Sequence, residues 1–426
     1  MRFLVYAIIN DMKIAIATAV YYPMTNGVAV FSFNRASGLA HRGHAVMVLC
    51  PSQTGKGHTE IQDGVKVVYL KSKQMHLYAD QLHPIPPKKR LFGKELPHVY
   101  YKNGFPISAL PAYQIKKTLD KFQPDIIHCQ GADPVGVAAA KYARKNYIPL
   151  ITTEHNMPDV FTGPLKLPKI VKKPVDALLA TYFVSRQKHS DYVTMPTQLA
   201  IDDLITEREK KFTAPVEAVS NGVDLSAFKA GPASPRVLKK YHLPSEYMLY
   251  VGRVDPEKQL PLVMKAFAKA LEEAPKAHFV VVGDGVDKAN LEKLVRKLKI
   301  GGSVTLLGRV LPPDVYDIYR GGLFFATASE IETQGIVLIE AAATGLPLIA
   351  VDKGAVAEIC KNNENGFLCE PKDVDAMAAG MVKLFNDKEL RQKFSTKSLE
   401  LAEKHDITNT LTRFEEIYQE VLKNKE

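Results

Sequence analysis

Short apolar runs alternate with longer amphipathic segments from one end of the chain to the other. The short runs have the length of buried strands, and the longer segments repeat their apolar residues with helical spacing. Strands that alternate with helices in this way are typical of βαβ units, in which the strands lie parallel. The pattern therefore predicts an α/β protein built on parallel sheets.

The first half of the chain has the elements of one Rossmann-like unit. Strands are predicted over residues 13–19, 44–50, 65–70, 125–129, 149–154 and 192–195. A helix is predicted over residues 30–41, because its amphipathic pattern stops just before Gly43 and glycine commonly follows the last turn of a helix.

The second half repeats the alternation and indicates a second unit of the same kind. Its predicted strands cover residues 248–251, 278–282, 304–307, 323–328 and 347–351, with helices over 258–274 and 287–298. A chain of 426 residues is long enough for two cores. We expect an N-terminal domain over residues 1–200, a polar linker region with several prolines over 201–240 and a C-terminal domain over 241–405, while a final helix in 406–426 is able to pack back on the first domain.

Composition narrows the class of protein further. The chain is 46% hydrophobic and 24% charged, as in folded globular proteins, and no apolar stretch is long enough to cross a bilayer. Residues 1–10 lack the basic and cleavage regions of a signal peptide, and Met12 directly precedes the first strand, so whether residues 1–11 are native is left open. The four cysteines show no metal-binding spacing and are expected to be buried thiols of a cytoplasmic protein.

Charge is distributed unevenly along the chain. Residues 1–200 hold 25 Lys and Arg against 12 Asp and Glu, a net of +13, whereas residues 201–426 hold 31 against 34, a net of −3. A basic surface confined to one half favours an anionic partner such as a phospholipid surface, although solubility explains part of it. No nucleic-acid recognition motif accompanies the charge, so a nucleic-acid partner is not expected.

A pair of glutamates follows a strand end in the second unit. Glu332 and Glu340 flank the turn at Gly335, after which a helix begins near Ile336. Glycine lets a backbone approach a ligand closely, and the first turn of a helix offers unpaired N–H groups to an anion. Carboxylates accept paired hydrogen bonds from neighbouring hydroxyls. The segment therefore predicts a site for a sugar nucleotide, with one of the two glutamates facing the sugar and the other facing the nucleoside.

A second motif follows the strand predicted at 248–251. Arg253 lies on the loop that begins at Gly252, and Lys258 lies at the start of the next helix. An arginine binds two phosphate oxygens at once and a lysine adds a mobile charge, so the two suit a diphosphate leaving group.

These motifs resemble those of the GT-B glycosyltransferases of family 4, a large group of retaining, metal-independent enzymes, and the resemblance covers essentially the whole chain. It implies two Rossmann-like domains whose parallel sheets face a central cleft. It also implies that Glu332 contacts the donor sugar, Glu340 the ribose, and Arg253 and Lys258 the diphosphate. The wider set implied to bind the donor is Gly27, Gly252, Arg253, Lys258, Gln334, Gly335, Ile336 and Glu340.

The first half contributes matching segments after two of its strands. By the same resemblance Asn26, Gly27 and Val28 lie near the acceptor, and His155, at the end of the fifth strand, lies near both the acceptor and the reacting sugar. The catalytic residues implied are His155, Glu332, Arg253 and Lys258.

One feature departs from the family pattern, and one aspartate pair needs a separate interpretation. The family often has an aromatic residue where this chain has Gln334, a variant that resembles bacterial lipid glycosyltransferases, including diacylglycerol glucosyltransferases. The Asp373-Val374-Asp375 segment is interpreted as a charge pair at a helix N-terminus. No metal and no cofactor are therefore expected.

The resulting hypothesis is transfer of a hexose, from UDP-glucose or a similar donor, to a membrane lipid such as diacylglycerol, by a cytoplasmic protein on the inner face of the cell membrane. The basic and apolar segments at residues 88–92 and 161–173 favour the lipid. A soluble or phosphorylated acceptor, a GT-B sugar-nucleotide epimerase and an inactive sugar-nucleotide-binding module are the alternatives. A Rossmann dehydrogenase is disfavoured, because no Gly-x-Gly-x-x-Gly follows the first strand. The oligomeric state is left open.

Overall fold

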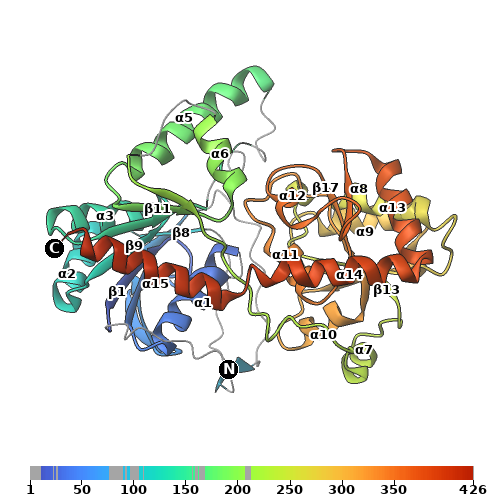
Figure 1. Cartoon of the computed structure of the whole chain (residues 1–426), viewed down its shortest axis with the longest axis horizontal. Coiled ribbons are helices and arrows are strands. Elements are labelled where there is room, and N and C mark those ends of the chain that lie inside the picture. The colour runs from blue at the N-terminus through green and yellow to red at the C-terminus, as the bar shows by residue number, and fades with distance from the viewer. Residues whose placement is uncertain are drawn as a thin grey trace.

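The chain folds around two separate sheets, each with helices packed against it (Figure 1). The computed structural model describes residues 11–22, 24, 27–75, 90–91, 94–95, 105–108, 110–155, 157–158, 162, 168–206 and 213–425. No helix within these ranges is both long enough and apolar enough to span a bilayer.

The first sheet has eight strands, and only its edge strand β3 runs antiparallel to its neighbour. In spatial order the strands are β12 (Val216–Ala218), β11 (Tyr192–Met195), β10 (Leu150–Thr153), β9 (Ile126–Gln130), β1 (Lys13–Thr18), β2 (Ala45–Pro51), β4 (Val65–Leu70) and β3 (His58–Gln62). Two short antiparallel pairs lie outside this sheet: β5 (Ser72–Met75) with β8 (Phe105–Ser108), and β6 (Arg90–Leu91) with β7 (Lys94–Glu95).

Alternation along the strands decides which helices cover each face of the first sheet. Ile14 and Ile16 of β1 point to α1 (Gly27–His41) and α15 (Ile407–Lys423), whereas Ala15 and Ala17 point to α2 (Pro111–Phe122) and α3 (Pro134–Lys145). The helices α5 (Lys169–Gln187) and α6 (Gln198–Thr206) share a smaller apolar cluster beyond β11. Near-continuous apolar strands are what a sheet covered on both faces requires.

The second sheet has six parallel strands and one large apolar core. Its order is β15 (Val304–Gly308), β14 (Phe279–Val282), β13 (Tyr247–Val251), β16 (Gly322–Ala326), β17 (Leu348–Val351) and β18 (Gly366–Cys369). The helices of this part are α7 (Pro235–Lys240), α8 (Leu260–Ala270), α9 (Lys288–Lys297), α10 (Asp314–Gly321), α11 (Ile336–Ala343), α12 (Val356–Ile359), α13 (Val374–Asn386) and α14 (Lys388–Glu403).

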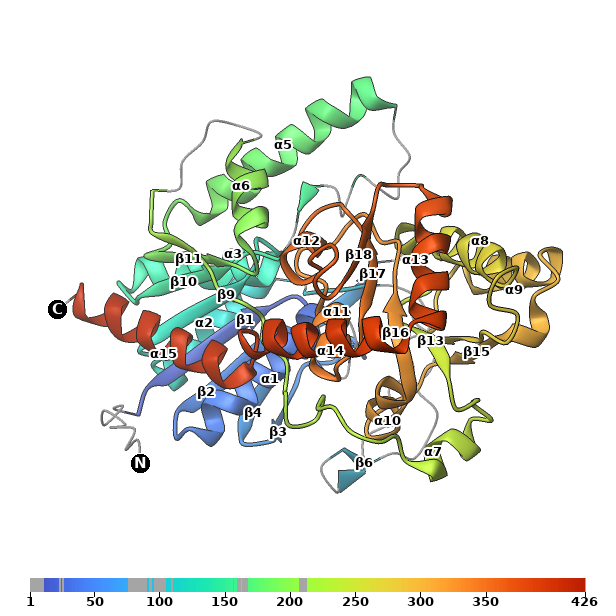
Figure 2. The ribbon, with the colours of Figure 1, turned by 45° about the vertical axis from the view of Figure 1, so that its right-hand side comes forward.

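The chain passes between the two parts twice. Figure 2 shows α14 and α15 running one after the other across the molecule, α14 beside the second sheet and α15 beside the first. The two passages touch, because Val223 and the residues around Asp406 form a parallel bridge. Direct hydrogen bonds also join the parts: Thr197 Oγ1 donates to the carbonyl of Thr333 at 2.9 Å, and the N–H of Leu199 donates to Glu358 at 3.0 Å.

The predicted α/β class with parallel sheets is confirmed. The predicted strands agree with the observed ones to within about two residues, and Val65–Leu70 and Tyr192–Met195 match at both ends. Seven strands of the described residues had no counterpart among the predictions, each too short or too polar to show a clear pattern: β3, β5, β6, β7, β8, β12 and β18. Both α6 and β12 lie within or beside the residues expected to form the linker, so the first sheet extends further along the chain than the apolar pattern indicated.

Candidate functional site

The N-terminus of α11 is shaped for an anion. Gly335 precedes the helix in the left-handed region, with φ of 75°, and a Cβ there would lie 2.9 Å from the side chain of Leu338. The carbonyl of Gly335 accepts from the N–H groups of Leu338 and Ile339. The N–H group of Ile336 has no backbone acceptor among the described residues. A helix start of this kind places N–H groups and a partial positive charge toward a bound anion.

Lys258 and Glu332 meet directly beside this helix start. The Lys258 ammonium lies 2.6 Å from Glu332 Oε1 and 3.5 Å from Ser329 Oγ. Both side chains are largely buried, at 16% and 15% exposed. The structure therefore brings together two residues that lie far apart in sequence and that the motifs assigned to the diphosphate and the sugar.

Arg253 is held by two carboxylates. Its guanidinium pairs with the buried Asp255, and its Nη2 donates to Glu257 Oε1 at 2.6 Å. Coulombic attraction to these carboxylates outweighs burial and raises the pKa of Arg253. Gly252 makes the loop possible: its φ is 154°, and a Cβ on Gly283 would lie 1.7 Å from its carbonyl oxygen.

Glu340 lies on α11, about one turn after its first residue, and it is paired with a tyrosine. Tyr319 of α10 donates to Glu340 Oε2 at 2.7 Å. Burial raises the pKa of Glu340 to about 7, although the Tyr319 hydroxyl acts in the opposite direction. A carboxyl group poised near neutral pH changes its hydrogen-bonding capacity in the range where the protein works.

Gln334 lies beside the segments in which the chain crosses from one part to the other. Its Oε1 accepts from the N–H of Asn221 at 3.0 Å and its Nε2 donates to Ser220 Oγ at 2.7 Å. Ser220 is also bonded to His405 on the second passage. Both polar groups of the Gln334 side chain are thus used within the protein, and donor binding by this residue stays a prediction.

The first part of the chain meets this site at the N-terminus of α1. A Cβ on Gly27 would lie 3.6 Å from Ile336 Cδ1, so the helices α1 and α11 begin next to each other. The neighbouring Val28 is partly buried. Asn26, the third residue assigned to the acceptor, lies outside the described residues.

His155 follows β10 at the carboxyl edge of the first sheet. It is 5% exposed, its Nε2 lies 2.9 Å from Gln130 Oε1 and its ring packs edge-on against Phe31 at 5.2 Å. Burial, with a smaller contribution from the charge of Arg35, lowers the pKa of His155 to about 3. This histidine is therefore neutral at physiological pH and offers one acceptor nitrogen.

The aspartates at residues 373 and 375 have structural partners. Asp373 caps α13 by accepting from the N–H of Ala376 at 2.9 Å, and Asp375 pairs with Lys269. In the part of the chain that the structure describes, no cluster of His, Cys, Asp and Glu has the makings of a metal site.

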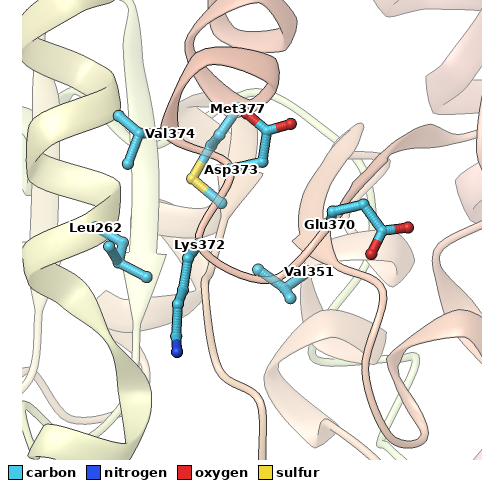
Figure 3. Close-up of a pocket in the computed structure, with 7 residues that line it drawn as sticks. All are labelled: Leu262, Val351, Glu370, Lys372, Asp373, Val374 and Met377. Carbon is cyan, nitrogen blue, oxygen red and sulfur yellow. The ribbon is translucent and has the colours of Figure 1, made fainter.

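A shallow surface hollow lies at this end of α13, away from the predicted site residues. Figure 3 shows it between α8 and α13, with the carboxylates of Glu370 and Asp373 pointing away from the Lys372 ammonium. Its mixed lining shows no convergent set of polar groups, so it carries no functional assignment.

Two residues at the site had not been predicted. Gln130 ends β9 next to the strand that His155 follows, so the strand-end rule applied to His155 could also have found it. Tyr319 gave no such signal, because its contact with Glu340 depends on how α10 packs beside α11.

Comparison with known proteins gives two family models that together cover most of the chain. The model of glycosyl transferases group 1 matches residues 238–400, and that of glycosyltransferase family 4 matches residues 25–227. The first match contains the α11 and Lys258 motifs, and the second contains the segments with Gly27 and His155.

Individual relatives are similar over most of their length. Alpha-monoglucosyldiacylglycerol synthase of Streptococcus pneumoniae is 28% identical over 352 residues, which are 80% of this chain and 71% of that protein. N-acetyl-alpha-D-glucosaminyl L-malate synthase of Bacillus anthracis is 25% identical, over 78% of this chain and 87% of that protein. The solved structure of Anabaena HepE in complex with UDP-glucose has the same fold, with a TM-score of 0.68 at 16% identity, and covers 96% of this chain and 100% of its own.

Proposed function

Because this chain belongs to the GT-B glycosyltransferases of family 4, we propose that it transfers a hexose from a nucleotide-diphosphate sugar, UDP-glucose or a similar donor, to a membrane lipid such as diacylglycerol. The observation that carries the donor half of the proposal is the Lys258–Glu332 pair at the start of α11. A cation, a carboxylate and free helix N–H groups at one point match a diphosphate joined to a sugar.

In the reaction that we propose, the nucleoside diphosphate departs from the sugar while positive charge holds its phosphates. Lys258, Arg253 and the N-terminus of α11 stabilise the negative charge that develops on the phosphate oxygens. The acceptor hydroxyl attacks from the face that the leaving group vacates, and a departing phosphate oxygen takes its proton. Configuration is then retained without a protein nucleophile, a metal ion or a cofactor.

The lipid acceptor is supported by the name of the streptococcal relative, a synthase of a glucosylated diacylglycerol, and by the surface of α5. Val171, Leu178 and Tyr182 are 44%, 68% and 38% exposed and recur along one face of this helix. Figures 1 and 2 show α5 projecting from the first sheet. Exposed apolar side chains on a basic domain suit insertion into an anionic leaflet.

The segments that first favoured a membrane are only partly within the described residues. Residues 88, 89 and 92 lie outside them, as do residues 161 and 163–167, whereas the lysine-rich end of the second segment forms the first turn of α5. We propose that this protein is cytoplasmic and binds the inner face of the cell membrane through α5 and its neighbouring lysines.

The proposal is tested by screening nucleotide sugars with the purified protein, with and without diacylglycerol vesicles, and measuring released nucleoside diphosphate. We expect release that depends on both UDP-glucose and the vesicles. Equal release with a soluble anionic acceptor such as malate, which the Bacillus anthracis relative carries in its name, would favour the alternative acceptor. No release with any donor would contradict the transferase.

Membrane binding has its own test, sedimentation with anionic and neutral vesicles across a salt series. The variant Leu178→Ser, Tyr182→Ser is expected to bind anionic vesicles several-fold more weakly than the parent. Tyr147→Ser is a matched control, because Tyr147 is 87% exposed on the same domain but lies at the end of α3. Equal binding by both variants and the parent would exclude α5 as the membrane contact.

A further inference from the structure

Arg35 of α1 is a fully buried arginine whose described surroundings contain no carboxylate partner. It is 0% exposed, and its Nη1 lies 3.3 Å from His128 Nε2. Its guanidinium lies 4.8 Å from the ring centroids of both Phe31 and Phe414. Its Nε and Nη2 atoms have no hydrogen-bond partner among the described residues. Burial lowers the pKa of Arg35 to about 10, which leaves it charged at neutral pH.

Arg42, seven residues later and directly after the last residue of α1, provides the natural comparison. Its Nη1 lies 2.6 Å from Glu415 of α15, so it joins the two helices through an ordinary ion pair. Arg35 also bridges α1 and α15, but through the ring of Phe414. A buried charge without a counter-ion is costly, and an apolar side chain would connect two helices more favourably. The charge of Arg35 is therefore better explained by its effect on its neighbours than by packing.

The first neighbour is His128 of β9, and Arg35 determines which of its ring nitrogens carries the proton. An arginine has only donors, so Nε2 of His128 must accept from it. Thr153 then donates to the same nitrogen at 2.7 Å, and Nδ1 carries the proton and donates to Tyr418 at 2.8 Å. The hydroxyl of Thr153 in turn accepts from Thr194 at 2.7 Å. One arginine thus sets the direction of a buried chain of hydrogen bonds.

The second neighbour is His155, which Arg35 reaches through Phe31. The Phe31 ring has the guanidinium over one face and the His155 ring packed against it. His155 is also anchored by Gln130, whose Oε1 lies 2.9 Å from Nε2. With Nε2 as the donor in that bond, Nδ1 is left to accept a hydrogen bond. Thr153, bonded to His128, precedes His155 by two residues, so both neighbours bear on the same strand end.

We propose that Arg35 is a positioning residue for glycosyl transfer, which orients His155 through Phe31 and fixes the proton of His128 beneath it. This inference rests on the proposed function, because it takes His155 to lie at the reacting sugar. In that role His155 presents Nδ1 as an acceptor to a substrate hydroxyl. A protonated imidazole would have no acceptor and would place a second positive charge near the sugar as it gains positive character.

The charges around His155 agree with this role. Burial is the main cause that lowers the pKa of His155, and the charge of Arg35 lowers it further. The same two causes, with His155 third, hold the pKa of His128 well below its ordinary value. The adjacent Glu154 accepts from the N–H of His155 and from Gln187, so its oxygens are engaged. Among the described residues, the titratable groups that face His155 are Arg35 from α1, His128 from β9, Tyr418 from α15 behind His128, and Glu154 beside it.

The test compares Arg35→Met, which removes the charge and keeps an unbranched apolar side chain, with Arg42→Met directly after the same helix. The protein is labelled with ¹⁵N at its 12 histidines, and the ring nitrogens are followed by NMR between about pH 4 and pH 9, with His128→Gln and His155→Gln used only to assign signals. In the parent we expect both rings neutral throughout, with the His128 proton on Nδ1. In Arg35→Met we expect the pKa of His155 to rise, while burial still holds it below its ordinary value of about 6.5, and the His128 proton to redistribute.

Activity and stability separate positioning from packing. Arg35→Met is expected to lower kcat about ten- to a hundredfold with KM little changed, and to keep or raise the melting temperature. Arg42→Met is expected to lower the melting temperature, because Glu415 loses a partner, without moving either histidine. Arg35→Lys keeps the charge and should retain a neutral His155 with part of the lost kcat, which also covers the case in which Arg35→Met does not fold.

Unchanged histidine signals in Arg35→Met, or in Arg35→Lys if only that variant folds, would overturn the proposal. So would an equal shift of His155 in Arg42→Met. The NMR readout needs no substrate, so it fails or succeeds independently of the proposed glycosyl transfer.

Discussion

The two sides of the site treat charge in opposite ways. On the α11 side each cation is paired with a carboxylate, Lys258 with Glu332 and Arg253 with Asp255 and Glu257. On the α1 side Arg35 lies among aromatic rings and histidines, and the pKa of His155 is lowered to about 3. One side holds opposite charges in contact, and the other holds one fixed charge with neutral partners.

This difference indicates a division of labour. Lys258 and Arg253 are 16% and 45% exposed, so a diphosphate is able to reach both cations, and Glu332 and Glu257, at 15% and 19% exposed, are the carboxylates that it would replace. The exchange would also release Glu332 for sugar hydroxyls. Arg35 is enclosed and has no carboxylate to exchange among the residues that the structure describes, so it acts on the groups that surround it. The first arrangement suits a ligand that arrives and leaves with each turnover, and the second suits a fixed environment for His155.

The largest expected effect comes from breaking the exchangeable side. Lys258→Ala should slow transfer by a factor of about a hundred or more, because a cation that stabilises the leaving group is lost. Steady-state rates measure it, with melting temperature as the check on folding. Lys269→Ala is the matched control, since Lys269 pairs with Asp375 on the surface of the same domain. Equal rates in the two variants would remove the diphosphate from Lys258, and Arg253→Ala should resemble Lys258→Ala.

The next effect separates the two glutamates. Glu332→Ala should lower kcat about tenfold with little change in the affinity for UDP, because it frees Lys258 while removing the contact that we propose to the sugar. Glu340→Ala should weaken UDP binding about tenfold, which is about 1.4 kcal/mol. Calorimetric titration with UDP and steady-state kinetics distinguish the two. Parental behaviour of both variants in both measurements would contradict the assignment.

A smaller effect is expected from pH. The pKa of Glu340 is raised to about 7, so its carboxyl is protonated below that pH and ionised above it. If Glu340 binds the ribose as proposed, its ionised form would accept from both hydroxyls, so UDP should bind several-fold more tightly as pH rises through about 7. Tyr319→Phe removes the hydroxyl that lowers this pKa and should move the midpoint to higher pH. A midpoint that moves down, or affinity that falls with rising pH, would show that Glu340 does not bind in the ionised form.

Removing metal ions is expected to have no effect on transfer. Transfer should continue at the full rate in excess chelator, since Lys258, Arg253 and the start of α11 supply the positive charge that a metal would otherwise bring. Rates with chelator, and then with magnesium or manganese restored, make the measurement. A loss that metal reverses would place an ion beside the diphosphate.

The sequence predicted the fold well because apolar strands and helical spacing are local signals. The same is true of Glu332, Lys258 and His155, which were found from their places after predicted strands, and their assigned roles stay predictions. The partners of these residues were not predictable in the same way. Nothing in the sequence joins Lys258 to Glu332, or Tyr319 to Glu340, before the strands are placed side by side. The role of Arg35 was hidden for the same reason, since an arginine on an amphipathic helix is ordinarily exposed.

The most direct test of the account follows both products of one reaction. UDP-glucose with an α-linked sugar is incubated with the protein and diacylglycerol vesicles, and NMR records UDP and the glycosylated lipid together. The account predicts one UDP for each lipid formed, an α linkage in the product, and a rate about a hundredfold lower for Lys258→Ala than for Lys269→Ala. A β linkage would contradict retention, and release of UDP at equal rates by the two variants would contradict the donor site proposed at the start of α11.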